Sequence, residues 1–208
     1  MLPDPQSLVS HINALHQEAV ARWHQSPPDT TDETYDGLFA NVCEEHRFNF
    51  LLWHEEDLAR SPDVSDQRIA AVKRAIDRYN QHRNDAIERL DESLVQLLAE
   101  AGVLPRADAR LNTETPASAI DRLSIMSLRI YHFDEQLART DVDQPHRAKV
   151  SERLQRCRVQ QADLSRSLAE LLMDIFAGRK LLKVYRQMKM YNDPTLNPFL
   201  VRAERRAG

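Results

Sequence analysis

The feature that most constrains the fold is a set of long stretches in which apolar residues recur three and four positions apart. The chain has only 4 glycines in 208 residues, and residues that favour helix dominate the long runs. The clearest stretch covers residues 65–101, where the apolar positions are Ile69, Val72, Ile76, Tyr79, Leu90, Leu94 and Leu97. This spacing places them on one side of a helix that packs against a neighbour. No run alternates as a strand does, so the sequence predicts an all-helical protein.

Boundary signals divide the chain into five helices, or six if the last one is interrupted. Asp4 can cap the first helix, Thr30 with Glu33 can form a capping box for the second, and Gly178 marks a break or kink in the last. The predicted helices cover residues 5–25, 30–60, 65–101, 115–140 and 145–190. Short links place neighbouring helices antiparallel. We expect one bundle domain over residues 1–208, with 191–208 as an extended or partly ordered tail.

Composition excludes several classes of protein. The net charge is -4, yet residues 151–208 hold 12 lysines and arginines against 6 acidic residues. The basic residues of this end are not interleaved with aromatic ones, so we expect no binding of nucleic acid. Cys43 and Cys157 do not form a metal-spaced pair and are too few for a disulfide framework. With no secretory signal and no apolar run of about 18 residues, we expect a cytoplasmic protein without a membrane span.

Polar side chains interrupt the apolar side of the second predicted helix. Glu45 and Asn49 run alongside Trp53 at helical spacing, and His54 follows directly. A buried polar group without a hydrogen-bond partner costs about 1–3 kcal/mol. A helix selected only for stability would carry aliphatic residues at these positions.

The third and last predicted helices repeat this pattern. Arg83 occupies a seam position of the third helix, where an aliphatic residue is expected. One face of that helix carries polar residues at helical spacing, including Asp77, Asn80, Asn84 and Glu88. After Gly178, the spacing of Arg179, Lys183 and Arg186 predicts a basic stripe on one helical face.

Two interpretations of these polar residues remain open. They can form an interhelical network with solvated outer faces, or they can line a cleft in which carboxylates and amides face basic groups. A cleft of this kind suits an anionic, hydroxylated ligand such as a sugar phosphate. The predicted ligand-binding residues are Asn49, Trp53, Asp77, Asn80, Arg83, Asn84, Arg179, Lys183 and Arg186. The candidates for catalysis are His54, His132 and Glu88, and a histidine is the suitable proton carrier near neutral pH.

The spacing of histidines and acidic residues indicates whether a helical bundle can bind a metal. Di-iron helical bundles carry a Glu-x-x-His motif on each of two helices, and the chain contains no such motif. In His54 with Asp57 and in His132 with Glu135 the histidine comes before the acidic residue, which is the reverse of that motif. Such pairs suit a place beside an ion, and they equally suit ordinary surface contacts. The sequence therefore predicts no metal site and no other cofactor.

Four segments resemble one family along most of the chain. They are NFLLWHEEDLAR (residues 49–60), AIDRYNQHRNDAIERLD (75–91), IDRLSIMSLRIYHFDEQ (120–136) and GRKLLKVYRQMKMYNDPTLNP (178–198). In this order they resemble the bacterial family called domain of unknown function 4254. The resemblance implies a helical cytoplasmic protein, often encoded beside glycosyltransferases of cell-surface polysaccharide or lipopolysaccharide assembly, and no established reaction or catalytic residues. A weaker similarity, limited to Ile76, Asp77 and Arg83, is to helical chorismate mutases.

Two functional hypotheses follow. In the first, the chain binds a sugar phosphate or nucleotide sugar in an interhelical polar cleft, with or without turnover. In the second, it is a non-enzymatic interaction module, either a homodimer or a partner of a glycosyltransferase. A cavity lined jointly by residues 77–88 and 179–186 would favour the first, and direct ion pairs between these two stretches would favour the second.

Overall fold

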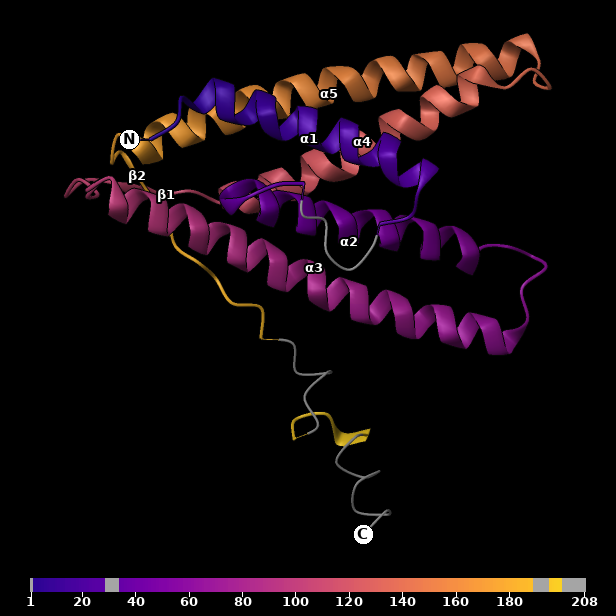
Figure 1. The fold of residues 1–208 in the computed structure, drawn as a ribbon, viewed down its shortest axis with the longest axis horizontal. Coiled ribbons are helices and arrows are strands. Elements are labelled where there is room, and N and C mark those ends of the chain that lie inside the picture. The colour runs from indigo at the N-terminus through magenta and orange to yellow at the C-terminus, as the bar shows by residue number, and fades with distance from the viewer. Residues whose placement is uncertain (1, 29–33, 189–194, 200–208) are drawn as a thin grey trace.

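The computed structural model describes residues 2–28, 34–188 and 195–199, and these are helical almost throughout (Figure 1). The helices are α1 (Pro5–Gln25), α2 (Gly37–Ala59), α3 (Asp66–Glu100), α4 (Pro116–Ala138) and α5 (Gln144–Phe176). Two strands of two residues each, β1 (Arg110–Leu111) and β2 (Lys180–Leu181), accompany them. The predicted all-helical class is confirmed. None of the described helices is apolar over a length that would cross a membrane.

Side chains at the helix starts accept hydrogen bonds from backbone N–H groups that have no partner within the helix. Asp4 accepts from the N–H of Ser7 at 2.8 Å at the start of α1, as its sequence position predicts. Thr115 accepts from the N–H of Ser118 at 3.2 Å at the start of α4. These caps fix where α1 and α4 begin.

The second helix begins later than predicted. It starts at Gly37, because Asp36 has extended backbone angles (φ -113°, ψ 159°) that precede the first helical turn. The capping box predicted from Thr30 and Glu33 lies outside the described residues.

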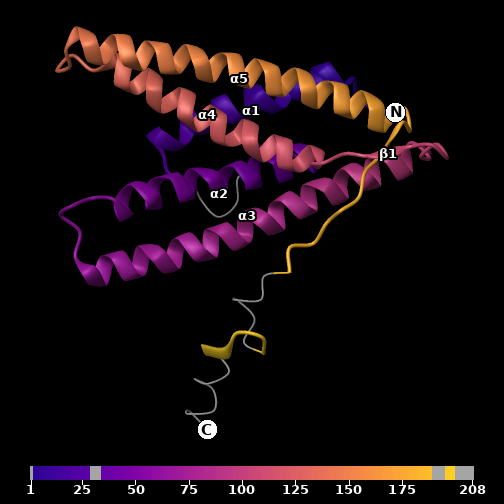
Figure 2. The ribbon, with the colours of Figure 1, turned by 180° about the vertical axis from the view of Figure 1, so that it is seen from behind.

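Helices that follow one another in sequence lie side by side, α2 with α3 and α4 with α5, while α1 packs against α2, α4 and α5 (Figures 1 and 2). The main core lies where these elements meet, and its fully buried residues include Ile12, Leu90, Leu123 and Leu172. Burying one such aliphatic side chain contributes about 1.5–3 kcal/mol. This core holds α1, α2 and α4 around the polar groups described below.

Beyond α5 the structure differs from the sequence prediction. Gly178 has a φ of +69°, and its carbonyl oxygen accepts from the N–H of Arg106 at 2.9 Å. Strand β2 then pairs in parallel with β1, with Lys180 beside Arg110, and residues 182–188 continue without helical structure. The predicted helix is therefore wrong for residues 179–188, where a strand of two residues and a non-helical segment follow Gly178. Pairing with a distant connector outweighs the helix-favouring composition of this segment. Of the predicted tail over 191–208, only residues 195–199 are described.

Candidate functional site

A buried polar network joins α2 to α4. Glu45 and Ser124 are 0% exposed and Asn49 is 4% exposed. The side-chain nitrogen of Asn49 donates to Glu45 Oε1 at 2.5 Å and to Asp121 Oδ1 and Ser124 Oγ at 2.9 Å each. An amide has two N–H bonds, and here they face three acceptors. The network thus presents more acceptors than the amide can satisfy at once.

His46 extends this network to α1. Its Nε2 lies 3.0 Å from the backbone carbonyl oxygen of His16, which can only accept, so Nε2 carries the hydrogen. Nδ1 therefore accepts from the hydroxyl of Ser124 at 2.7 Å. Burial lowers the pKa of His46 to about 3, and burial together with His46 lowers the pKa of His16 well below its ordinary value. Both rings are neutral near pH 7, and His46 orients Ser124 instead of carrying protons.

The network ends at two carboxyl groups and one guanidinium group. Burial raises the pKa of Glu45 well above its ordinary value, and the charge of Asp121 raises it further, while Arg83 acts in the opposite direction. The Nε of Arg83 lies 3.8 Å from Asp121 Oδ1. This Nε is buried and has no hydrogen-bond partner in the described part of the chain. Arg83 therefore retains hydrogen-bonding capacity beside the carboxylate.

Arg83 lies on the wall of a cavity of about 360 Å³ between α2, α3 and α4, which we call the Arg83 lobe. Both charged groups and apolar surface line it. Its lining residues are Asn49, Leu52, Trp53, Glu56, Asp57, Arg60, Asn80, Arg83, Ile125 and Leu128. This mixture of amides, charges of both signs and one indole suits a polar ligand with a ring.

A second cavity of about 240 Å³, the His132 lobe, adjoins the first. Trp53 and Asp57 line both lobes, and His132 and Arg129 line only the second of the two. The indole of Trp53 stacks on the imidazole of His132, with ring centroids 4.9 Å apart and planes inclined by 10°. We call the two lobes together the α2 cleft.

The structure brings some predicted ligand-binding residues together in this cleft and leaves others out. Asn49, Trp53, Asn80 and Arg83 all line the Arg83 lobe. Asp77 is exposed and forms an ion pair with Lys73 in the next turn of α3. Asn84 is 5% exposed but does not line the lobe.

The basic residues that follow Gly178 do not form the predicted helical stripe, because this segment is not helical. Arg179 is exposed and pairs with Asp174 at 2.8 Å, and Lys183 is exposed on the segment after β2. Arg186 pairs with Glu88 at 3.1 Å and with Glu92. None of these three residues lines the Arg83 lobe, so Glu88 and Arg186 meet directly instead of facing each other across it.

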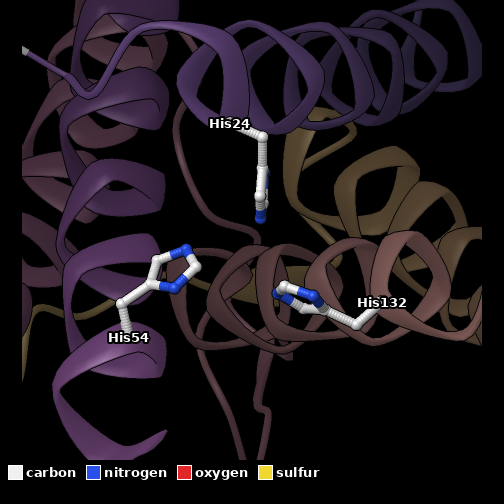
Figure 3. A group of neighbouring side chains, drawn as sticks. All are labelled: His24, His54 and His132. Carbon is white, nitrogen blue, oxygen red and sulfur yellow. The ribbon is translucent and has the colours of Figure 1, made fainter. Parts of the chain in front are cut away.

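The two predicted catalytic histidines lie next to a third, which sequence reasoning missed. His24 from α1, His54 from α2 and His132 from α4 converge in one place (Figure 3). One potential ligand nitrogen from each ring lies within 4.8 Å of those of the other two. Burial, and then the charges of His24 and His132, lower the pKa of His54. The prediction of no metal site is not tested by this arrangement.

Several residues of the site carry no local signal in the sequence. His24 lies in the last turn of α1, where a basic residue is an ordinary partner of the helix dipole. Glu45, Asp121 and Ser124 lie on interrupted helical faces, but only the packing of α2 against α4 shows that they contact the same amide. For Glu45 the sequence does carry a signal, since it lies one helical turn before Asn49 on an interrupted apolar side.

A larger groove of about 860 Å³ runs between α4 and α5, and it shares Ile125 with the Arg83 lobe and Arg129 with the His132 lobe. Its lining mixes apolar residues such as Met126, Leu164 and Leu171 with Arg122, Asp163 and other charged groups. Four carboxylates line this groove against three basic groups, so the groove carries no marked preference for an anion.

The fold and the cleft define an all-helical protein with a buried polar network beneath a charged interhelical cavity. The profile of the family described as "Protein of unknown function (DUF4254)" matches residues 40–184, and the chain belongs to this family. The match runs from Ala40 in α2 to beyond β2 and includes the lining of the α2 cleft, whereas α1 with His24 lies outside it. No curated protein and no solved structure shows significant similarity to the chain.

Proposed function

We propose that the chain binds an anionic, hydroxylated small molecule, such as a sugar phosphate or a nucleotide sugar, in the α2 cleft. The observation that carries this proposal is Arg83, whose buried Nε lacks a hydrogen-bond partner and lies 3.8 Å from its nearest carboxylate oxygen. A guanidinium group binds phosphate or carboxylate oxygens through parallel N–H donors. The Arg83 side chain is 26% exposed, so an anion in the lobe could accept hydrogen bonds from its guanidinium group.

The rest of the Arg83 lobe supports a hydroxylated ligand. The amide of Asn80 offers both donors and an acceptor, and the carboxylates of Glu56 and Asp57 accept from hydroxyl groups. The indole of Trp53 provides a flat apolar face for a ring. Anion binding in this proposal rests on Arg83 instead of the predicted set Arg179, Lys183 and Arg186. Arg60 also lines the lobe, where it pairs with Glu56 at 2.6 Å.

Turnover of the ligand is a separate step of the proposal. It would need a proton carrier, and His132 is the histidine that lines the cleft. Glu88, another candidate from the sequence, accepts from Arg186 and from the N–H of Gln187 at 2.8 Å, so it is already engaged. In line with the family resemblance, we place this activity in the cytoplasm, in the metabolism of bacterial surface polysaccharides.

Thermal unfolding in the presence of ligands tests the proposal. Hexose phosphates and nucleoside diphosphate sugars are compared with free hexoses and inorganic phosphate. A ligand at about 100 times its Kd stabilises the folded state by about 2.7 kcal/mol, which raises the Tm by several degrees in a chain of this size. We expect Arg83→Gln to lose this shift and Arg78→Gln, an exposed arginine on the same helix, to keep it. The proposal fails if no compound raises the Tm, or if both variants respond as the wild type does.

A second candidate function is a non-enzymatic interaction module, in which two copies or a glycosyltransferase partner pack on the helices. The direct pairing of Arg186 with Glu88 and Glu92 favours it, as does the groove between α4 and α5. Val159 and Met173 on α5 are 50% and 39% exposed. Sedimentation velocity over a range of concentrations tests the homodimer, and a monomer at every concentration would exclude it.

A further inference from the structure

The three histidines that meet between α1, α2 and α4 have nitrogens that the rest of the protein does not use. The Nε2 atoms of His24, His54 and His132 are all buried and have no hydrogen-bond partner in the described part of the chain. A buried polar group without a partner costs about 1–3 kcal/mol. Three such atoms from three different helices in one place indicate that something absent from the protein itself satisfies them.

In His24 and His132, the hydrogen bond of Nδ1 determines that Nε2 is the nitrogen without a proton. His24 Nδ1 lies 2.8 Å from the backbone carbonyl oxygen of Val20 and donates to it, since the carbonyl can only accept. His132 Nδ1 lies 2.7 Å from Glu135 Oε2 and donates in the same way to that carboxylate. Both rings therefore present the lone pair of Nε2 to the centre of the cluster. Metal-binding histidines are held by such bonds to a carbonyl or a carboxylate.

The spacing of the rings also fits one central ion. The ring centroids are 5.0 Å apart for His24 and His132, 5.2 Å for His24 and His54, and 5.8 Å for His54 and His132. Three imidazoles on a tetrahedral zinc ion, with Zn–N bonds of about 2.0–2.1 Å, have centroids about 5 Å apart. The ring planes are inclined by 66° to 78°, so the rings surround a point and do not stack on one another.

Aromatic side chains pack around the three histidines. Tyr131 stacks on His24 with centroids 4.1 Å apart, Phe50 contacts the edge of His54 at 4.4 Å, and Trp53 stacks on His132. An aromatic shell of this kind restricts the rotation of the imidazoles.

We propose that His24, His54 and His132 bind one divalent transition-metal ion, with zinc as the first choice. Neutral imidazole suits Zn²⁺ as well as Cu²⁺, Fe²⁺ and Ni²⁺. Three protein ligands leave the fourth tetrahedral position for water or a bound molecule, as in zinc sites that take part in catalysis. Because His132 also lines the α2 cleft, the metal site adjoins the cavity in which we propose that a ligand binds. The metal site stands on its own geometry and does not depend on that ligand.

The experiment measures binding of Zn²⁺ to the full chain after treatment with a chelator and dialysis. A competition titration against a chromogenic zinc indicator gives the stoichiometry and the Kd, and Co²⁺ gives the visible absorption of a tetrahedral site. We expect one equivalent of Zn²⁺ and loss of stoichiometric binding in His24→Gln, His54→Gln and His132→Gln. His82→Gln, a change of an exposed histidine on α3, is the control and should bind as the wild type does.

A variant that leaves all three ligands in place guards against loss of binding through unfolding. Glu135→Gln changes a half-exposed residue that only orients His132, and we expect the Kd for Zn²⁺ to rise about 10- to 100-fold. Circular dichroism verifies the helical content of each variant. Absence of stoichiometric Zn²⁺ binding in the wild type would overturn the proposal. Unchanged binding in folded His54→Gln and Glu135→Gln variants would overturn it as well, because the ion would then lie elsewhere.

Discussion

Asp91 makes the stability of the protein depend on pH in a way that can be calculated from the structure. This carboxyl group on α3 is 3% exposed, and its Oδ1 accepts from the backbone N–H of Ala117 at 3.0 Å in the first turn of α4. Burial raises its pKa from 3.8 to about 6, although the hydrogen bonds to Thr115 and Ala117 act against the rise. Asp91→Asn keeps the size of the side chain and one acceptor oxygen but removes the titration.

The sign of the effect follows from the two pKa values. Because the folded pKa lies above the unfolded one, the folded state binds the extra proton between about pH 4 and 6. The stabilisation from the protonated form is complete below the unfolded pKa and is lost as the pH rises through about 6. A difference of about two pKa units corresponds to about 3 kcal/mol, of which about 2 kcal/mol falls between pH 4 and 7. The Asp91→Asn variant does not titrate at this position, so its free energy of unfolding does not fall for this reason as the pH rises.

Urea denaturation at several pH values between 4 and 7 measures the effect. We expect the free energy of unfolding of Asp91→Asn, relative to wild type, to rise by about 2 kcal/mol across this range. Asp141→Asn is the control, because the ion pair of Asp141 with Arg139 lowers its pKa to about 2. The stability that this group contributes is lost only as the pH falls through about 2, so its difference from wild type should vary little between pH 5 and 7. A flat or falling difference for Asp91→Asn would refute the reasoning.

Two further predictions concern the scaffold of the site. Ser124→Ala removes the donor to the buried Nδ1 of His46, so urea denaturation should show a free energy of unfolding lower by about 1–3 kcal/mol. Ser127→Ala changes another buried serine on α4 and should lower this free energy by less. Equal losses in the two variants would contradict the role of the network. Gly178 and Gly102 have the same φ of +69°, but an added Cβ meets a backbone oxygen at 2.6 Å only at Gly178. Gly102→Ala should lower the free energy of unfolding by about 1 kcal/mol through backbone strain, and Gly178→Ala should lower it by clearly more. Equal midpoints of urea denaturation for the two variants would disprove this.

The sequence predicts the parts of this structure that depend on local interactions. The start of α1 follows from Asp4, whose side chain caps the helix as expected, and α4 begins at Pro116 directly after Thr115. Residues 179–188 show the opposite case. Their composition favours helix, yet the pairing of Lys180 with Arg110 decides their conformation, and no local pattern encodes a contact between such distant residues.

The residues of the site were predictable from local sequence patterns, but their partners on other helices were not. Asn49 and Arg83 interrupt apolar faces, and an interrupted face indicates which side of a helix turns towards its neighbours. The identity of the partner across the interface depends on how the helices pack. For this reason His54 and His132 were recognised as candidates, while His24, which α1 places beside them, was not.

The position of Trp53 between the two lobes of the α2 cleft has an optical consequence. The chain has only 2 tryptophans, and the other, Trp23, is 3% exposed within the core. Replacing Trp23 with phenylalanine would leave a single indole as the fluorophore, in contact with His132 and with the Arg83 lobe. Its emission wavelength and quenching would then report occupancy of either lobe without any attached dye.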